Sequence, residues 1–308
     1  MLDIFSKTLP FFAVIGLGYF ASRRGLFSVE ANTYLTKFVF YFALSAMLFS
    51  FSAKLDLGDI LSWNFIFAYL IGTGFVYSLG FVFGLIRSLS IPEAAVEAQC
   101  CAIGNVGFLG IPMLSLLMGN EAVGYVMIVL AVDLIVFGSL IILLIVGARK
   151  EQMRINLIRK LLGGLVRNPM IVAILTGLSW SALDVPIPLP AWEFVTLLGA
   201  AATPCALFAI GASLAQKSAE RVFTAFWVSI SKLVLHPLAV AFSALFLFDI
   251  PAYPASVMIV TSALPVAGNI YILAQHYKIA PQRVSASILV STSISIFSIS
   301  LVLILVAA

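Results

Sequence analysis

The sequence is poor in charge. Only 10% of its 308 residues are charged, 62% are hydrophobic, and the mean hydropathy is +1.15. Soluble domains carry about 25% charged residues, so this composition excludes a soluble fold. The apolar runs are continuous and lack the alternation of membrane β-strands. The composition therefore predicts an all-α polytopic membrane protein.

The sequence also lacks the patterns of common catalytic and metal sites. It has two histidines and an odd number of cysteines, Cys100, Cys101 and Cys205, without metal-ligand spacing. It contains no H-E-x-x-H, G-x-S-x-G or Walker A pattern. We therefore expect no catalytic residues, no metal and no cofactor, and an intramembrane enzyme is the least favoured function.

The length accommodates ten transmembrane spans joined by short loops. A span needs about 20 apolar residues to cross roughly 30 Å of hydrocarbon. The first span continues to Arg23-Arg24 without a small-residue cleavage site, so we expect it to stay in the mature protein. The predicted spans are 2–22, 32–52, 60–86, 92–117, 121–147, 164–183, 191–216, 221–247, 252–277 and 282–307.

The basic residues predict the orientation. Most of the 17 lysines and arginines follow odd-numbered spans, and short basic loops stay cytoplasmic. Both termini should thus lie on the non-cytoplasmic side of the plasma (inner) membrane. The net charge of +4 reflects this orientation and does not indicate nucleic acid. A basic cytoplasmic connector, 149–162, would separate two five-helix repeats, 1–148 and 163–308.

Two glycine-asparagine pairs lie inside apolar segments, Gly104-Asn105 and Gly268-Asn269. Each has a proline nearby, Pro112 and Pro265, so we expect helices 4 and 9 to be broken there. Matched breaks in two halves are typical of the midplane site of transporters built from inverted repeats. Free helix ends and asparagine amides can bind a carboxylate, with Tyr271 as an aromatic wall. The alternative is that these small residues serve helix packing.

Charged and polar residues inside the spans are the second set of candidates. Asp133 and Lys232 both lie near mid-span, where a charge is costly. They form either a structural ion pair or a site for proton or substrate coupling. Glu93 and Glu97 open span four and are interpreted as capping charges, although Glu97 is kept as a coupling candidate. His236 is either a satisfied polar group or a pH-sensitive one.

Several motifs together resemble the auxin efflux carrier family, which includes plant auxin exporters and bacterial carriers of malonate and similar acids. The resemblance covers nearly the whole chain. Ser45 departs from it, because the family usually has proline there, which would soften a kink in span two. The motifs are KFVFYFALSAMLF, GNVGFLGIPML, RNPMIVAILTGL, TPCALFAIGASLA, KLVLHP and ALPVAGNIYILAQHY.

The resemblance implies ten helices as two inverted repeats, with helices 4 and 9 crossing at their breaks. Spans 1, 2, 6 and 7 would form a scaffold and spans 3, 4, 5, 8, 9 and 10 a mobile core. It implies an elevator-type carrier of mono- or dicarboxylates and a possible homodimer through the scaffold in membrane lipid. The alternative carrier is a sodium-coupled symporter of the bile-acid type.

Overall fold

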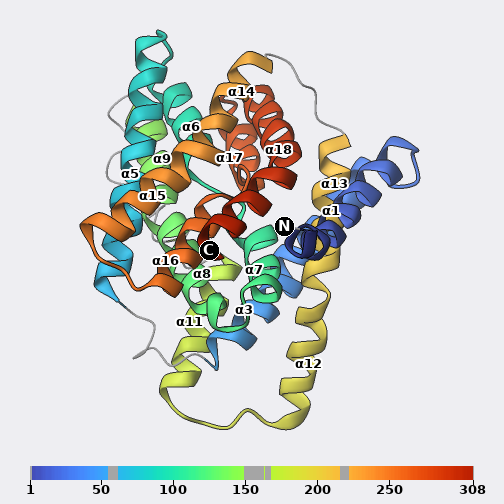
Figure 1. The fold of residues 1–308 in the computed structure, drawn as a ribbon. Helices are drawn as coiled ribbons and strands as arrows, with labels where there is room; N and C mark the ends of the chain where they lie inside the picture. Colours follow the sequence, from blue (N-terminus) through green and yellow to red (C-terminus); the bar gives the residue numbers. More distant parts are fainter. Residues whose placement is uncertain (1, 55–61, 149–162, 164–167, 216–221, 308) are drawn as a thin grey trace.

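The computed structural model describes residues 2–54, 62–148, 163, 168–215 and 222–307. These residues form helices and their connections, and the part of the chain described here contains no β-strand beyond an isolated bridge, Gly104 with Val266. The predicted all-helical class is therefore confirmed (Figure 1). The predicted connector, 149–162, lies outside the described residues.

The described residues of the first half form five helical stretches, several of them divided by short π-helical turns (η). The second stretch contains η1, Val39–Ala43, the fourth contains η2, Val106–Gly110, and the fifth contains η3, Asp133–Phe137. The α-helices are α1 Leu2–Arg23, α2 Val29–Phe38, α3 Leu44–Ser52, α5 Trp63–Ile86, α6 Ile91–Ala102, α7 Ile111–Leu117, α8 Glu121–Val132 and α9 Gly138–Gly147.

The second half also folds into helical stretches with π-helical turns. Its turns η5, Ser231–Leu235, and η6, Ser243–Leu247, flank α15. The α-helices are α11 Pro169–Ala182, α12 Leu189–Ala200, α13 Ala202–Ala215, α14 Val222–Ile230, α15 His236–Phe242, α16 Ala252–Ser262, α17 Gly268–Tyr277 and α18 Pro281–Ala307.

Side chains with hydrogen-bonding oxygens begin several of these helices. Ser28 Oγ accepts a bond from Ala31 N at 3.1 Å, and Asn168 Oδ1 accepts one from Met170 N at 3.0 Å. Such caps satisfy the free N–H groups of a first turn. Asn168 is followed by Pro169, which tolerates the first helical position because it has no N–H to pair.

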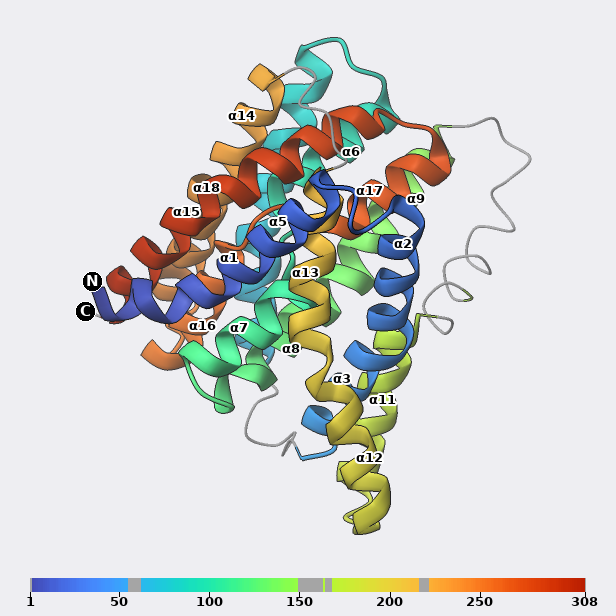
Figure 2. The same cartoon turned by 90° about the vertical axis from the view of Figure 1, so that its right-hand side faces the viewer.

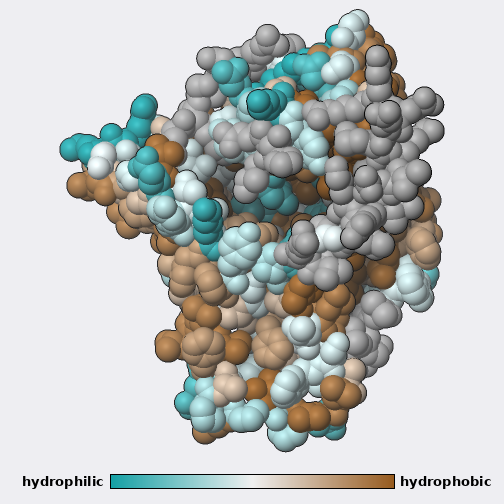
Figure 3. Space-filling model, turned by 180° about the vertical axis from the view of Figure 1, so that it is seen from behind, coloured by the Kyte–Doolittle hydropathy of each residue, from teal (hydrophilic) through white to brown (hydrophobic). Residues whose placement is uncertain are grey.

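Six helical stretches are long and apolar enough to cross a membrane, and four shorter apolar ones accompany them in the described part of the chain. Many large apolar side chains on these stretches are exposed, for example Leu197 and Phe246. Hydrophobic residues cover much of the face seen from behind, and hydrophilic ones gather toward one end (Figure 3). This surface fits a multi-pass protein whose flanks contact lipid.

The helices pack into two groups (Figure 2). In the first group, α13 packs on α1 and α2, while α3 packs on α11 and α12. In the second group, α5 packs on α6 and α15, α16 packs on α8 and α15, and α18 packs on α14 and α17. The groups meet where α1 and α13 contact α18, where η2 contacts α13, and where α3 contacts α8.

Candidate functional site

Two chain breaks lie against each other inside the second group of helices. The first break separates α6 from η2, and the second separates α16 from α17. Asn105 N donates to Pro265 O at 2.8 Å, and Ala267 N donates to Ile103 O at 3.2 Å. These two hydrogen bonds use backbone groups that the breaks would otherwise leave unpaired in a membrane interior. They also fix the two unwound segments side by side.

The two predicted helix-breaking prolines occupy different positions relative to the breaks. Pro265 lies inside the second break, as predicted, and has no N–H to donate. The first break lies earlier than the position predicted from Pro112. Pro112 instead lies inside the continuous helix of η2 and α7, just after the π-helical turn, where the missing N–H removes one helical hydrogen bond.

A partly open cavity of about 150 Å³ adjoins the crossing. The helical segments η2 and α17 both begin at its wall, so two helix N-termini meet one small space. Helix N-termini have unpaired N–H groups and a partial positive charge. The lining residues are Phe40, Gln99, Ile103, Gly104, Asn105, Val106, Gly107, Phe108, Leu130, Asp133, Leu134, Gly138, Ile141, Asn168, Met170, Ala267, Asn269, Ile270 and Leu273.

The cavity brings together most of the predicted binding residues. Asn105 is buried and Asn269 is exposed, and both line the cavity with Gly104. Gly268 is the first residue of α17, and a side chain there would meet open space. Tyr271 is not among the lining residues. It is partly buried and packs against the hydrophobic core, so the predicted aromatic wall is not formed by this residue here.

Asn168 was missed by sequence reasoning, where it appeared only as part of the motif RNPMIVAILTGL. Its Oδ1 caps α11, yet Asn168 also lines the cavity opposite the crossing. Gln99 lies at the wall on α6, and its buried Oε1 has no hydrogen-bond partner among the described residues. Together with the two predicted asparagines, these residues give the cavity four side-chain amides.

Lys232 lies beside the crossing and is fully buried. Its Nζ donates to the carbonyl of Ser262, the last residue of α16, and lies 2.9 Å from His236 Nδ1. A charged lysine can only donate, so Nδ1 accepts and the Nε2–H faces Thr73 Oγ1 at 2.9 Å. The ammonium therefore compensates the negative C-terminal end of α16. His236 is a satisfied polar group of this cluster.

Asp133 has a different partner from the one expected. Tyr69 OH donates to Asp133 Oδ1 at 2.7 Å, and among the described ion pairs none joins Asp133 to Lys232. The expectation of a direct pair was wrong, because the Lys232 ammonium is held by Ser262 and His236 instead. The two charges still attract each other through space. Asp133 is 4% exposed and lines the cavity.

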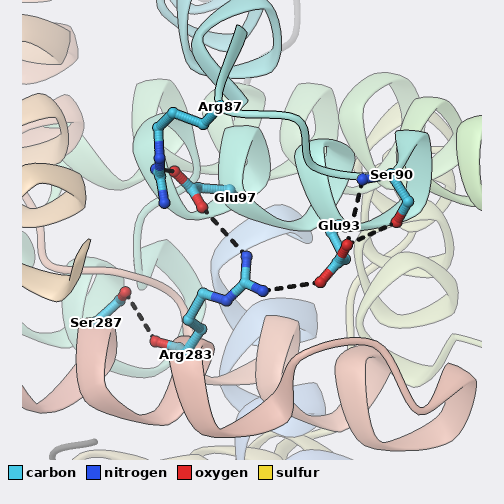
Figure 4. A network of polar contacts seen from close by, with 6 residues as sticks. All are labelled: Arg87, Ser90, Glu93, Glu97, Arg283 and Ser287. Atoms are coloured by element: carbon cyan, nitrogen blue, oxygen red, sulfur yellow. Dashed lines mark hydrogen bonds and ion pairs between the residues drawn. The ribbon is translucent and has the colours of Figure 1, made fainter. Parts of the chain in front are cut away.

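Glu93 and Glu97 belong to a network of polar contacts with Arg87, Ser90 and Arg283 (Figure 4). Glu93 completes a capping box with Ser90, which confirms its predicted role. Glu97 is not a capping residue, since it pairs with Arg87 and lies 3.6 Å from Arg283. Arg283 also contacts Glu93 at 2.8 Å. The network joins α5, α6 and α18 away from the cavity, so Glu97 is a structural charge here.

A second and larger cavity, of about 800 Å³, lies between the two helix groups. It is lined by residues of α3 and α12 on one side and of α7, α8 and α16 on the other, including Pro112. Lys54 lies at its edge, with Nζ 4.1 Å from the ring centroid of Trp192. This cavity thus separates the groups on the side of the molecule where α12 begins.

Comparison with known proteins identifies the family. A family model described as "Membrane transport protein" matches residues 3–303. A protein of Rhizobium meliloti (strain 1021) named "Putative malonate transporter" is 28% identical over 97% of this chain and 95% of its own length. An uncharacterized transporter of Methanocaldococcus jannaschii is 25% identical over 92% of this chain and 93% of its own. The resemblance that the motifs indicated is thereby confirmed, and the chain belongs to this family of membrane transporters and is not an enzyme.

Proposed function

We propose that the chain is a secondary transporter of small organic anions, mono- or dicarboxylates such as malonate or auxin-like weak acids. The observation that carries this proposal is the meeting of two half-helix N-termini and two asparagines, Asn105 and Asn269, at one cavity. Carboxylates bind where backbone N–H groups and amide donors converge. The name of the Rhizobium relative is consistent with such a substrate.

The size and character of the cavity support a small substrate. A volume of about 150 Å³ holds a molecule of only a few carbon atoms, and the walls combine amides with apolar side chains such as Phe40 and Leu273. Gly104 keeps the crossing compact, because a Cβ there would lie 3.3 Å from Lys232 Nζ and from Leu264 Cβ. A larger weak acid would need the walls to move apart.

The packing of the two helix groups supports elevator-type movement. The first group corresponds to the scaffold expected from spans 1, 2, 6 and 7, and the second to the mobile core. Within each group, glycines let helix backbones approach closely. Examples in the first group are Gly199 against Met47 and Gly211 against Ile15, and in the second Gly72 against Val240.

Between the two helix groups, Gly107 makes a close contact of another kind. A Cβ at Gly107 would meet the terminal methyl of Met170, which is the flexible end of a side chain. Sliding of one body against the other requires contacts between them that can yield, and this contact is of that kind. The 800 Å³ cavity between the groups would then be an access route.

The geometry favours a carrier that does not use sodium. A bound sodium ion needs several oxygen ligands, and the Ser262 carbonyl at the crossing is already occupied by the Lys232 ammonium. His236 and Thr73 complete this cluster without a metal. The sodium-coupled symporter of the bile-acid type therefore remains the alternative with less support.

Ligand binding to the purified protein tests the proposed site. Malonate should raise the thermal unfolding midpoint saturably, since a ligand at 100 times its Kd contributes about 2.7 kcal/mol. Asn105→Ala and Asn269→Ala should lose this stabilisation while remaining folded. Asn64→Ala, which changes an exposed asparagine at the start of α5, is the matched control. Undiminished stabilisation in both site variants would move the site elsewhere.

A further inference from the structure

The anion cavity contains an acid. Among the described residues that line it, Asp133 is the one whose side chain ionises. The carboxylate belongs to the π-helical turn η3, and π-helical turns often place side chains at functional sites. A carboxylate beside a site for carboxylates is unexpected, because the two negative charges repel each other strongly away from water.

The surroundings of Asp133 leave one of its oxygens available. Oδ1 accepts from Tyr69 OH at 2.7 Å, whereas the buried Oδ2 has no hydrogen-bond partner in the described part of the chain. Buried polar atoms are rarely left unpaired, and an exception suggests a missing partner. The Asp133 side chain is 96% enclosed by the protein and still forms part of the cavity wall.

The other charged and titratable groups near Asp133 have interactions that do not involve its Oδ2 atom. Tyr69 of α5 faces Asp133 directly, and its ring also contacts the His236 ring, with centroids 6.1 Å apart. Lys232 of η5 attracts the carboxylate through space but is held by Ser262 and His236. Cys101 of α6 interacts with Lys232 on its other side. None of these described groups supplies a proton donor to Oδ2.

We propose that Asp133 takes up one proton whenever an organic anion binds, so that anion and proton cross the membrane together. This inference rests on the proposed transport function. Two carboxylates in one site hold a proton between them more readily than either does alone. The proton comes from the aqueous side that supplies the anion, resides on Oδ2 as a donor to the substrate carboxylate, and leaves with the anion on the other side. The empty carrier returns with Asp133 ionised.

Liposomes containing the full-length protein test the coupling. Malonate is supplied at an outside pH near 7 with an inside pH near 8, and the membrane potential is clamped at zero. One proton per anion across one pH unit should drive about tenfold accumulation of labelled malonate in the wild type. A pH-sensitive dye inside should report one proton entering for each malonate.

The Asp133→Asn variant should break this ratio, since an amide cannot take up the proton. Whatever malonate movement remains should carry no proton and show no accumulation from the pH gradient. Asp133→Glu should retain a ratio of one. Glu193→Gln, which neutralises an exposed acid on α12, is the matched control and should behave as the wild type.

The outcomes separate the two proposals. Net saturable uptake of malonate without proton entry in the wild type would overturn the coupling and leave the transport function standing. Proton entry that persists in Asp133→Asn would also overturn it, because the proton would then travel on the substrate. Loss of all transport in both Asp133→Asn and Asp133→Glu would overturn it too, since a carboxyl should suffice. Absence of any exchange in the folded wild type would instead reject the transport function.

Discussion

Lys232 holds together a cluster of buried polar groups in the interior of the protein. It is completely enclosed, and its ammonium joins the end of α16 to His236 of the neighbouring helix. The sequence indicated that this lysine needed a partner, and Asp133 was the nearest charge at the same depth. The actual partners are a backbone carbonyl and a histidine one turn away, which sequence spacing cannot rank against a distant acid.

Replacing Lys232 should therefore destabilise the fold. In Lys232→Met the Ser262 carbonyl and His236 Nδ1 lose their lysine donor and keep only each other, 3.0 Å apart, while staying buried. A buried polar group that loses its partner costs about 1 to 3 kcal/mol. The unfolding midpoint measured in detergent should fall by several degrees. Lys37→Met removes an exposed lysine that lies over Tyr34 and should leave the midpoint nearly unchanged. Equal midpoints for the two variants would contradict the assigned role of Lys232.

At the scale of the helices, the approximate positions of the helices were predictable from the sequence. The exact positions of the breaks within them were not. The long apolar segments and the two glycine-asparagine pairs lie where the sequence indicated, whereas the serine and asparagine caps were seen only in the structure. The break of helix 4 differs because the helix continues through Pro112 from η2 into α7, while the chain unwinds at Ile103 to Asn105 to pair with the second break. That pairing is a tertiary contact between segments far apart in sequence.

The close packing of α1 on α13 is the clearest test at this scale. A Cβ at Gly211 would collide with the Ile15 carbonyl on α1, and a Cβ at Gly18 would collide with the Phe208 carbonyl on α13. We expect Gly211→Ala to force the helices apart at a cost of about 1 to 3 kcal/mol. The unfolding midpoint should drop by several degrees.

Gly16→Ala is the matched control for this substitution. Gly16 also lies on α1, but a Cβ there would meet nothing within 4 Å. The control should equal or slightly exceed the wild type in stability, because alanine favours a helix over glycine. A drop in Gly16→Ala as large as that in Gly211→Ala would show that contact with α13 does not set the effect.

At the scale of the whole molecule, composition alone was sufficient for the membrane class and the all-helical fold. The two packing groups could be identified only from the structure, because the sequence of a single helix does not show which other helices it packs against. The cavity also needed the structure, since Asn168 reaches the wall from the start of α11, which neither glycine-asparagine pair marks. The orientation of the termini and the dimer through the scaffold stay predictions.

The central claim is that the chain carries organic anions through the site where the broken helices cross. Its most direct test is counterflow of labelled malonate in liposomes preloaded with unlabelled malonate, with potassium replacing sodium in a parallel sample. We predict saturable exchange that is unaffected by sodium, retained in Asn64→Ala and reduced to the protein-free level in Asn105→Ala. Exchange of equal rate in Asn105→Ala, or no exchange in the folded wild type, would contradict the account.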